Sequence, residues 1–289
     1  MIEQYLIHLA IIVGIYLILA LGLQITVGLT GILNLGHIAL FGIGAYTSAI
    51  LVKAGFSFWI GISAGALLAA LIGGLLILFV HRLKGDYVAL ATLGFTFVTY
   101  AVLLNWTSLT RGPLGIPGIT KPTFFDFVFG SSAQYLGLVV LFVLLAILVY
   151  WFMKKSYFGL TLQAIRDNEL ASKSLGRNTL AYKFSAMTIA GFFAGVAGSL
   201  YAHYITYIDP SSFTIFQLMP VLIIVIVAGL TSLRGTIIAA IIIILLPEPL
   251  RFLGFPSSIV GPMRQIMYVL ILFAILYFKP KGLFGKVEL

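Results

Sequence analysis

Ionisable side chains gather in one stretch of the sequence, residues 154–183, and their spacing favours ionic contacts. The chain has 17 basic and 8 acidic side chains. Eight of these lie in the stretch: Lys154, Lys155, Arg166, Asp167, Glu169, Lys173, Arg177 and Lys183. A helix turns by about 100° per residue, which places Arg166, Glu169 and Lys173 on one face. Glu169 precedes Lys173 by four positions, the favourable order for an ion pair. The stretch therefore predicts a charged surface rather than a catalytic centre.

A helix within this stretch is predicted from its ends and its faces. Thr161 can serve as the N-cap and Gly176 as the C-terminal stop, which gives a helix of about 15 residues. Ala164, Ala171 and Leu175 fall on a second face that is small and apolar. Such a helix is too short and too charged to span a membrane. It could lie passively at the lipid headgroups, or it could be a docking helix for a cytoplasmic partner.

Asn34 and His37 are polar side chains inside a glycine-rich apolar run, residues 28–45. The five glycines of this run favour a broken helix or a half-helix. Irregular backbone at membrane depth occurs only where protein or a water-filled cavity satisfies it, and transporters place their pathways at such breaks. Asn34 and His37 are therefore candidates for lining a translocation pathway.

A polar stripe follows the apolar run of residues 87–106. Thr92, Thr96 and Thr99 are spaced i, i+4 and i+7, so a helix places them on one face. This stripe could line a cavity, or it could hydrogen-bond to a neighbouring helix. The three threonines are further candidates for the pathway.

Other ionisable side chains near the apolar runs have structural explanations. Asp86 is expected to favour a helix N-terminus. Glu248 is expected at the outer end of a span, near Arg251, and His203 is expected to extend toward the membrane interface. A carrier driven by protons or sodium ions would place several carboxylates or histidines in mid-span, and their scarcity argues against that class.

Several patterns on which enzymes depend are missing. The chain has no cysteine, and therefore no thiolate ligand and no Cys nucleophile. It has no His-x-x-x-His pair, and no Gly-x4-Gly-Lys-[Ser/Thr] phosphate loop. We therefore predict no catalytic residue, no metal site and no cofactor, and if transport is active its energy must arrive from another subunit.

The elements that position these groups are predicted to lie in a membrane. Hydrophobic residues make up 61% of the chain and charged residues 9%, with a mean hydropathy of +1.15, whereas a soluble domain carries about 25% charged residues. Apolar runs occur at roughly 5–27, 36–52, 56–80, 87–106, 134–153, 184–205, 213–230, 235–250 and 263–278. We predict an all-α, polytopic transmembrane helical bundle of about 8–10 spans, with a broken Gly-rich helix and a single domain over residues 1–289.

The distribution of Lys and Arg indicates which ends face the cytoplasm. If residues 154–183 are cytoplasmic and the later spans alternate, 12 of the 17 basic residues lie inside. These are Arg82, Lys84, Lys154, Lys155, Arg166, Lys173, Arg177, Lys183, Arg234, Lys279, Lys281 and Lys286. The bias predicts a cytoplasmic C-terminus, leaves the side of the N-terminus open, and explains the net charge of +9 without a nucleic-acid partner. The longest outer loop is then residues 107–133, where Gly and Pro favour turns.

Small residues recur at four-residue spacing in Gly61-x-x-x-Gly65 and Gly191-x-x-x-Gly195. This spacing permits close helix packing, although it is also what a glycine-rich apolar chain would show by chance.

The segment Arg166-Asp-Asn-Glu-Leu-Ala-Ser-Lys-Ser-Leu-Gly-Arg-Asn178 resembles the cytoplasmic loop of permeases from ABC importers. More specifically, it resembles the LivM-type permeases of branched-chain amino acid importers. Other segments are similar to signatures of that family and follow in the same order: residues 31–37 with 41–46, 84–95, 105–116, 228–235, 246–248 and 279–283. The resemblance covers about residues 24–285.

Two positions depart from the family pattern. The wider importer motif reads Glu-Ala-Ala, three residues, then Gly, whereas this chain has Glu169-Leu-Ala171 and reaches Gly176 one residue late. Leu230 stands where the family usually has a second glycine after Gly229.

The resemblance implies an importer subunit of the cell inner membrane that moves branched-chain amino acids or a related small polar solute, such as urea, a short amide or an aromatic acid. It implies a LivH-like second permease, two cytoplasmic ATP-binding subunits, a periplasmic solute-binding protein and surrounding membrane lipid. Coupling to the ATPase would then involve Arg166, Asp167, Glu169, Lys173 and Gly176. The alternatives are a stand-alone secondary transporter and a polytopic membrane enzyme.

Overall fold

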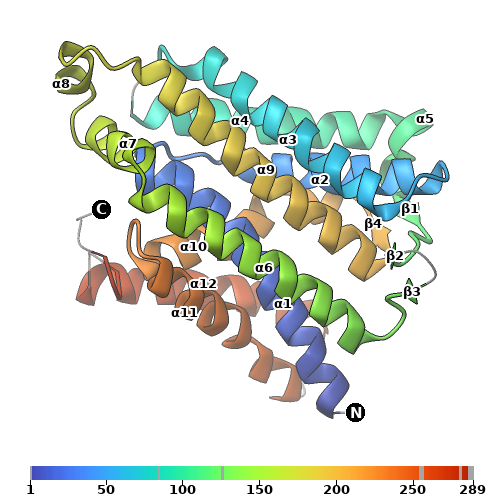
Figure 1. The fold of residues 1–289 in the computed structure, drawn as a ribbon. Coiled ribbons are helices and arrows are strands. Elements are labelled where there is room, and N and C mark those ends of the chain that lie inside the picture. The colour runs from blue at the N-terminus through green and yellow to red at the C-terminus, as the bar shows by residue number, and fades with distance from the viewer. Residues whose placement is uncertain (1, 84, 125–126, 254–256, 280–281, 286–289) are drawn as a thin grey trace.

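The computed structural model describes residues 2–83, 85–124, 127–253, 257–279 and 282–285 of the 289-residue chain. Within these ranges every predicted apolar run coincides with a helix, and the helices form one bundle (Figure 1). They are α1 (Ile2–Leu23, continued by the π-helical η1, Gln24–Leu29), α2 (His37–Lys53), α3 (Phe58–Val80), α4 (Asp86–Asn105), α6 (Ser132–Lys155), α9 (Thr179–Ile205), α10 (Ile215–Ala228), α11 (Leu233–Leu245) and α12 (Ser257–Phe278).

The length and composition of these helices confirm an all-α, polytopic membrane protein. Seven helical segments of the described ranges are long and apolar enough to cross a bilayer, and shorter apolar helices lie at His37–Lys53 and Ile259–Ile275. All of them except the central α2 expose large apolar side chains on part of their surface, as lipid-facing helices do.

Short elements connect the long helices at the two ends of the bundle. After α4 come α5 (Thr107–Thr110), η2 (Gly112–Leu114), β1 (Ile116–Pro117), β2 (Thr123–Phe124) and β3 (Phe127–Val128). After α6 come α7 (Tyr157–Asp167) and α8 (Glu169–Ser174), and after α9 come β4 (Tyr207–Ile208) and η3 (Pro210–Phe213). The helix η4 (Glu248–Leu253) follows α11. Antiparallel pairing joins β1 to β4 and β2 to β3.

Polar contacts define the two ends, which we call the loop end and the α8 end. At the loop end, the Nζ of Lys53 donates to Pro117 O at 2.8 Å, which ties α2 to the loop between α4 and α6. At the α8 end, the Nζ of Lys154 donates to Thr231 O at 2.5 Å. Leu283 N donates to Val227 O at 2.8 Å, so the described C-terminal residues also lie at the α8 end, opposite the loop end (Figure 1).

Basic side chains concentrate at the α8 end. They belong to the α3–α4 connection, the 154–183 segment, the first turn of α11 and the residue after α12. Those described are Arg82, Lys154, Lys155, Arg166, Lys173, Arg177, Lys183, Arg234 and Lys279. Three others that were predicted inside, Lys84, Lys281 and Lys286, lie outside the described residues.

Helices α2, α3 and α9 pack at the centre through glycine. A Cβ atom at Gly195 of α9 would lie 2.7 Å from Ala66 Cα and 2.8 Å from Gly65 O of α3. A Cβ atom at Gly65 would lie 2.7 Å from Gly44 O of α2. These distances are shorter than real side chains tolerate, so the helices approach this closely only because Cβ is absent. The Gly-x-x-x-Gly interpretation is confirmed.

The predicted break in the glycine-rich run is also confirmed. After η1 the chain leaves the helix and residues 31–36 are non-helical until α2 begins at His37. Gly31 has φ +71°, a left-handed conformation that a residue without Cβ adopts at little cost. The break lies at the α8 end of α1 and α2 and is enclosed by α4, α7 and α9.

Candidate functional site

The helix predicted from Thr161 to Gly176 begins earlier than expected. Its first part, α7, starts at Tyr157, and Ser156 is the N-cap, whose hydroxyl accepts from Gly159 N at 3.2 Å. Thr161 lies inside the helix, where its hydroxyl donates to Tyr157 O at 2.9 Å. The prediction of Thr161 as N-cap is therefore wrong, because α6 ends next to a serine that caps α7 immediately.

A break at Asn168 divides the predicted helix in two. Asn168 has an extended backbone (φ −156°, ψ 101°), and its side-chain oxygen accepts from Ala171 N at 2.9 Å to cap α8. Asparagine competes with helix continuation in this way because its short side chain can replace a backbone acceptor. Since Arg166 precedes the break and Glu169 follows it, the predicted single face of Arg166, Glu169 and Lys173 is wrong. The predicted apolar face of Ala164, Ala171 and Leu175 is likewise divided.

Arg166 turns inward, toward the end of η1. Its Nη1 donates to Gly28 O at 2.6 Å, and its guanidinium is 2.9 Å from the carboxylate of Asp167. The side chain is only 10% exposed. Gly28 lies in the last turn of η1, where backbone carbonyls lack an intrahelical donor, so Arg166 satisfies one of them and fixes α7 beside the broken helix.

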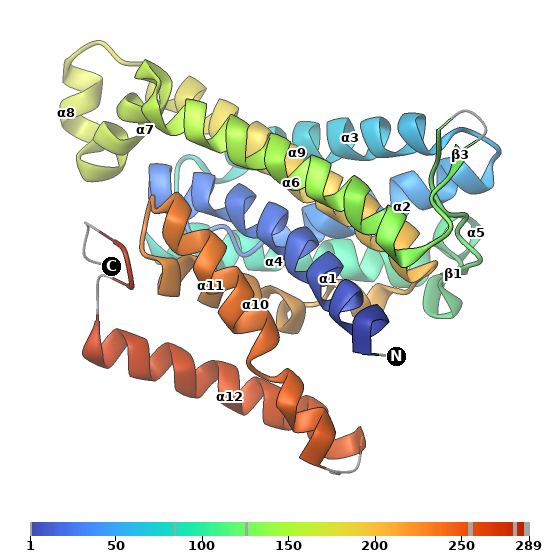
Figure 2. The same ribbon diagram turned by 60° about the horizontal axis from the view of Figure 1, so that its bottom comes forward.

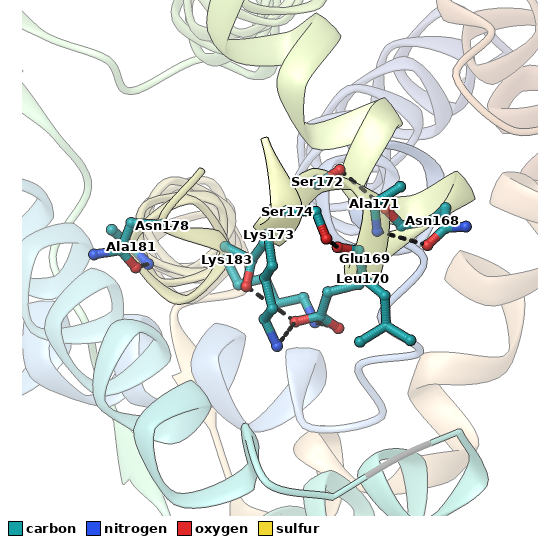
Figure 3. A network of polar contacts seen from close by, with 11 residues as sticks. Asn168, Glu169, Leu170, Ala171, Ser172, Lys173, Ser174, Asn178, Ala181 and Lys183 are labelled. Atoms are coloured by element: carbon teal, nitrogen blue, oxygen red, sulfur yellow. Dashed lines mark hydrogen bonds and ion pairs between the residues drawn. The ribbon is translucent and has the colours of Figure 1, made fainter. Parts of the chain in front are cut away.

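Glu169 connects α8 to the beginning of α9, as Figure 3 shows. Its carboxylate is 3.0 Å from Lys173 Nζ and 2.6 Å from Lys183 Nζ, and it accepts from the Thr179 hydroxyl at 3.0 Å. The expected i, i+4 pair with Lys173 is present, whereas Lys183 and Thr179 are partners that helical spacing does not indicate.

These contacts lower the pKa of Glu169 from 4.5 to about 2. Burial opposes ionisation of the carboxylate, but the hydrogen bonds from Lys183 and Lys173 and the positive charge of Lys183 outweigh that effect. The Glu169 side chain is therefore an anion throughout the physiological pH range.

The remaining part of the segment is exposed. Gly176 has φ +76° directly after α8, which confirms it as the helix stop. Leu170 is 76% exposed and Leu175 is 81% exposed. Together with the exposed Lys173, they form what we call the α8 surface. Leu170 was not singled out from the sequence. A large apolar residue beside Glu169 in a short polar helix is nevertheless a pattern that indicates a contact surface.

Asn34 and His37 lie in and beside the unwound segment, and both are fully buried. The Asn34 side-chain oxygen accepts from Gly36 N at 3.0 Å, so it closes the turn that starts α2. His37 Nε2 donates to Leu19 O of α1 at 2.9 Å, while its Nδ1 is buried without a partner among the described residues. His37 therefore holds the break against α1, and Asn34 stabilises the turn itself and contacts Met187 of α9.

The threonine stripe of α4 faces the same segment. The hydroxyl of Thr92 accepts from Leu35 N at 3.0 Å, and the hydroxyl of Thr96 donates to Leu35 O at 2.9 Å. Thr99 continues the stripe and is 9% exposed. Of the two interpretations, the hydrogen bonds of Thr92 and Thr96 favour a supporting contact with neighbouring backbone. The structure brings these residues and Asn34 to one place, and lining of a pathway by them stays a prediction.

One structural expectation from the sequence is corrected. His203 does not extend to the interface: it is fully buried, with Nε2 3.0 Å from the Ser48 hydroxyl and Nδ1 2.7 Å from Thr120 O. It joins α9 and α2 to the loop between α4 and α6. Glu248 lies in η4, which follows α11, and pairs with Arg264 of α12 at 3.0 Å, a partner that is 16 positions away and was not anticipated. The side chain of Arg251, its expected neighbour, lies outside what the structure describes.

A serine motif that sequence reasoning overlooked does not form a catalytic elbow. Gly61-Ile-Ser-Ala-Gly65 matches the Gly-x-Ser-x-Gly pattern, which requires a strand-to-helix turn. Here it lies within α3, and Ser63 is on the exposed side of that helix. Over the described ranges, no three His, Asp or Glu side chains are grouped so that they could hold a metal ion.

Comparisons with known proteins agree on one family. The family model described as the permease component of branched-chain amino acid transport systems matches residues 5–278. The chain is 34% identical to the high-affinity branched-chain amino acid transport system permease protein LivM of Escherichia coli, over 98% of this chain and 71% of the relative. It is 28% identical to the probable LivM of Methanocaldococcus jannaschii, over 93% and 90%.

A more distant relative carries a different name. The nucleoside ABC transporter permease protein NupC of Lactococcus lactis is 28% identical over 61% of this chain and 60% of the relative. No solved structure matches the chain.

Proposed function

Because the chain belongs to the permease family of branched-chain amino acid transport systems, we propose that the solute it moves is a branched-chain amino acid or a closely related small polar molecule. The chain is a permease subunit of an ABC importer in the inner membrane, and its relatives include permeases named for nucleosides. The extensive match to two LivM proteins supports the amino acid as the first choice. Ionisable side chains are scarce in the middle of the spans, which argues against a stand-alone secondary transporter.

The α8 surface is the observation from which we infer coupling to ATP hydrolysis. It projects beyond the bundle (Figure 1) and exposes Leu170 and Leu175 among charged side chains. Large apolar side chains that remain this exposed on a short polar helix favour contact with another protein. Arg166 and Glu169 act differently, since Arg166 binds Gly28 and Glu169 binds α9. Arg166, Asp167, Glu169 and Gly176 then give α8 its position, and the leucines with Lys173 make the contact.

The partner on this surface is an ATP-binding subunit. These 289 residues contain no Gly-x4-Gly-Lys-[Ser/Thr] loop to hold the phosphates of ATP. Two such subunits would bind under this chain and a LivH-like second permease, and a periplasmic solute-binding protein would deliver solute at the loop end. Selectivity would lie chiefly in that binding protein.

The same arrangement gives an orientation. Nine of the described basic side chains lie at the α8 end, against Lys53, Arg111, Lys121 and Arg264 elsewhere. Positive loops remain in the cytoplasm, which supports a cytoplasmic α8 end and, with it, a cytoplasmic C-terminus. If the chain crosses the membrane an odd number of times, the start of α1 then lies on the periplasmic side, at the loop end.

Uptake by the assembled importer tests the function. Proteoliposomes that contain this chain, the second permease and the ATP-binding subunits should accumulate radiolabelled leucine when the binding protein and ATP are supplied. Omission of the ATP-binding subunits should abolish uptake. Calorimetry on the cognate binding protein identifies the solute, and an importer that accumulates no amino acid, or that needs no ATP-binding subunit, contradicts the proposal.

Substitution of both leucines tests the α8 surface. Leu170→Ser with Leu175→Ser should weaken binding of the ATP-binding subunit by roughly 100-fold, because each leucine contributes about 1.5 kcal/mol or more when it is buried. Solute-stimulated ATP hydrolysis should fall with it, while insertion of the permease is unchanged. Leu114→Ser, at an equally exposed leucine of the loop end, is the matched control. Coupling at the wild-type level in the double variant would refute the docking role.

A further inference from the structure

A cavity of about 300 Å³ lies between α1, α10, α11 and α12. On α1 it is lined by Ile12 and Tyr16, and beyond α11 by Glu248, whose carboxylate accepts from the Tyr5 hydroxyl at 2.5 Å. The helix α12 closes its outer side and runs along the edge of the bundle (Figure 2). The volume is at the lower end of the range for small-molecule sites.

One part of the cavity wall is charged. Glu248 and Arg264 form an ion pair at 3.0 Å, with side chains only 12% and 26% exposed. The Nε of Arg264 is buried and has no hydrogen-bond partner in the described part of the chain. Glu248 belongs to a segment, Leu233–Leu250, that is long and apolar enough to cross a bilayer, and Arg264 belongs to the shorter apolar helix Ile259–Ile275. Ionisable side chains in such segments are costly, and where they occur they usually belong to a functional site.

The other part of the wall is apolar. Ile12 of α1, Phe216 of α10 and Ile244 of α11 line the same cavity. Gln217 adds an uncharged polar group, 3.5 Å from the Tyr16 hydroxyl. An acid, a base and an aliphatic wall within one small cavity match the three parts of an aliphatic amino acid.

We propose that this cavity binds a zwitterionic α-amino acid with an aliphatic side chain during its passage, with Arg264 on the carboxylate and Glu248 on the ammonium group. The inference rests on the proposed function and adds to it a solute site within the permease. A zwitterion brings one charge of each sign, so the Glu248–Arg264 pair can be exchanged for two ion pairs without leaving a charge unpaired. Arg264 Nε can then donate to a carboxylate oxygen, since a guanidinium binds carboxylates through two parallel N–H groups.

The side chain of the amino acid would contact Ile12, Phe216 and Ile244. This geometry predicts which analogues bind. A molecule without the ammonium group offers Glu248 no replacement for Arg264, and a molecule without the carboxylate offers Arg264 no replacement for Glu248. Both are disfavoured because separating a buried ion pair without replacing the lost partner is costly.

The test uses the assembled importer in nanodiscs, without the binding protein, and radiolabelled L-leucine as the probe. For the wild type, unlabelled leucine should compete, whereas 4-methylpentanoate and 3-methylbutylamine should not. Glu248→Gln should weaken leucine binding about tenfold or more and admit 4-methylpentanoate, which lacks the ammonium group. Arg264→Gln should have the opposite selectivity and admit 3-methylbutylamine. A merely structural ion pair predicts no such exchange of selectivity.

Two further variants keep the test decisive. Phe216→Trp changes no charge, and Phe216 is 59% exposed, so the variant should fold; by filling the apolar part it should weaken leucine binding but spare glycine. Lys53→Gln removes a positive charge elsewhere at the loop end and should change nothing. Unchanged leucine affinity and unchanged analogue exclusion in the charge variants or in Phe216→Trp would overturn the site. If wild-type importer still accumulates leucine, only the site is refuted; if it accumulates none, the proposed function itself fails.

Discussion

Two neighbouring ionisable residues, Arg166 and Glu169, show how one side chain can organise a segment. Arg166 reaches 138 positions back along the chain to Gly28 O, and Glu169 reaches forward to Lys183. Their sequence spacing predicts a shared helix face, but the cap at Asn168 separates them. Local spacing predicted the Glu169–Lys173 pair but not the long-range partners Gly28 and Lys183, since these are set by how the helices pack.

We predict that Glu169→Gln loosens α8 from α9. The neutral amide cannot form the ion pairs with Lys173 and Lys183, so α8 should separate more often. Trypsin should then cleave after Lys173 or Arg177 several times faster than in the wild type, measured by gel analysis of the purified protein. Asp86→Asn is the control, because it removes an exposed acid at the start of α4, outside the α8–α9 contact. Equal cleavage rates in wild type and Glu169→Gln would exclude this role.

The pKa of Glu169 gives that contact a defined pH dependence. The folded-state pKa of about 2 is below the ordinary 4.5, so the carboxylate stabilises the folded arrangement fully above about pH 4.5 and loses this effect as the pH falls toward 2. Hydrogen exchange in residues 168–178, corrected for intrinsic rates, should be constant from pH 5 to 8 and should accelerate below it. Glu169→Gln should lack that acid transition. Wild-type protection that persists at about pH 2 would contradict the assignment.

At the scale of the elements, apolar length predicted every long helix, and glycine predicted both the break before α2 and the close contact of α2, α3 and α9. What the sequence did not reveal is the division of α7 from α8 and the role of the α4 threonines. An N-cap at Asn168 competes with helix continuation by only a small free energy. A threonine stripe shows the same spacing whether it faces water or the backbone of Leu35.

The glycine contact supports a sharp prediction. Gly195→Ala should destabilise the bundle by about 1–3 kcal/mol, because its Cβ atom would overlap the backbone of α3 at Ala66 and Gly65. Gly137→Ala in α6, where a Cβ atom meets nothing within 4 Å, is the matched control and should be neutral or slightly stabilising. Thermal unfolding in detergent measures both. Equal melting temperatures for the two variants would show that the close contact of α3 and α9 does not contribute to the stability of the bundle.

At the scale of the whole molecule, two opposite ends and a basic α8 end follow from the distribution of Lys and Arg. The sequence could not place α12, which lies at the edge of the bundle, or pair its Arg264 with Glu248. Such pairs depend on how helices far apart in the sequence meet. A single domain over residues 1–289 stays a prediction.

The orientation can be measured directly because the chain has no cysteine. In single-cysteine variants, Lys121→Cys at the loop end should react with a membrane-impermeant maleimide on intact spheroplasts. Lys173→Cys should react only after permeabilisation, since we propose that the α8 end faces the cytoplasm. The reverse pattern would invert the molecule and remove the docking role of α8.

The hydrogen bonds of Thr92 and Thr96 to the unwound segment, residues 31–36, have a consequence for insertion of the protein into the membrane. The backbone of Leu35 obtains its partners from Thr92 and Thr96, which the ribosome makes about 60 residues later, a delay of roughly 3–12 s at usual translation speeds. Lipid cannot satisfy that backbone in the meantime. We therefore expect α1 and α2 to stay beside the insertion machinery, or in contact with water, until α4 is made.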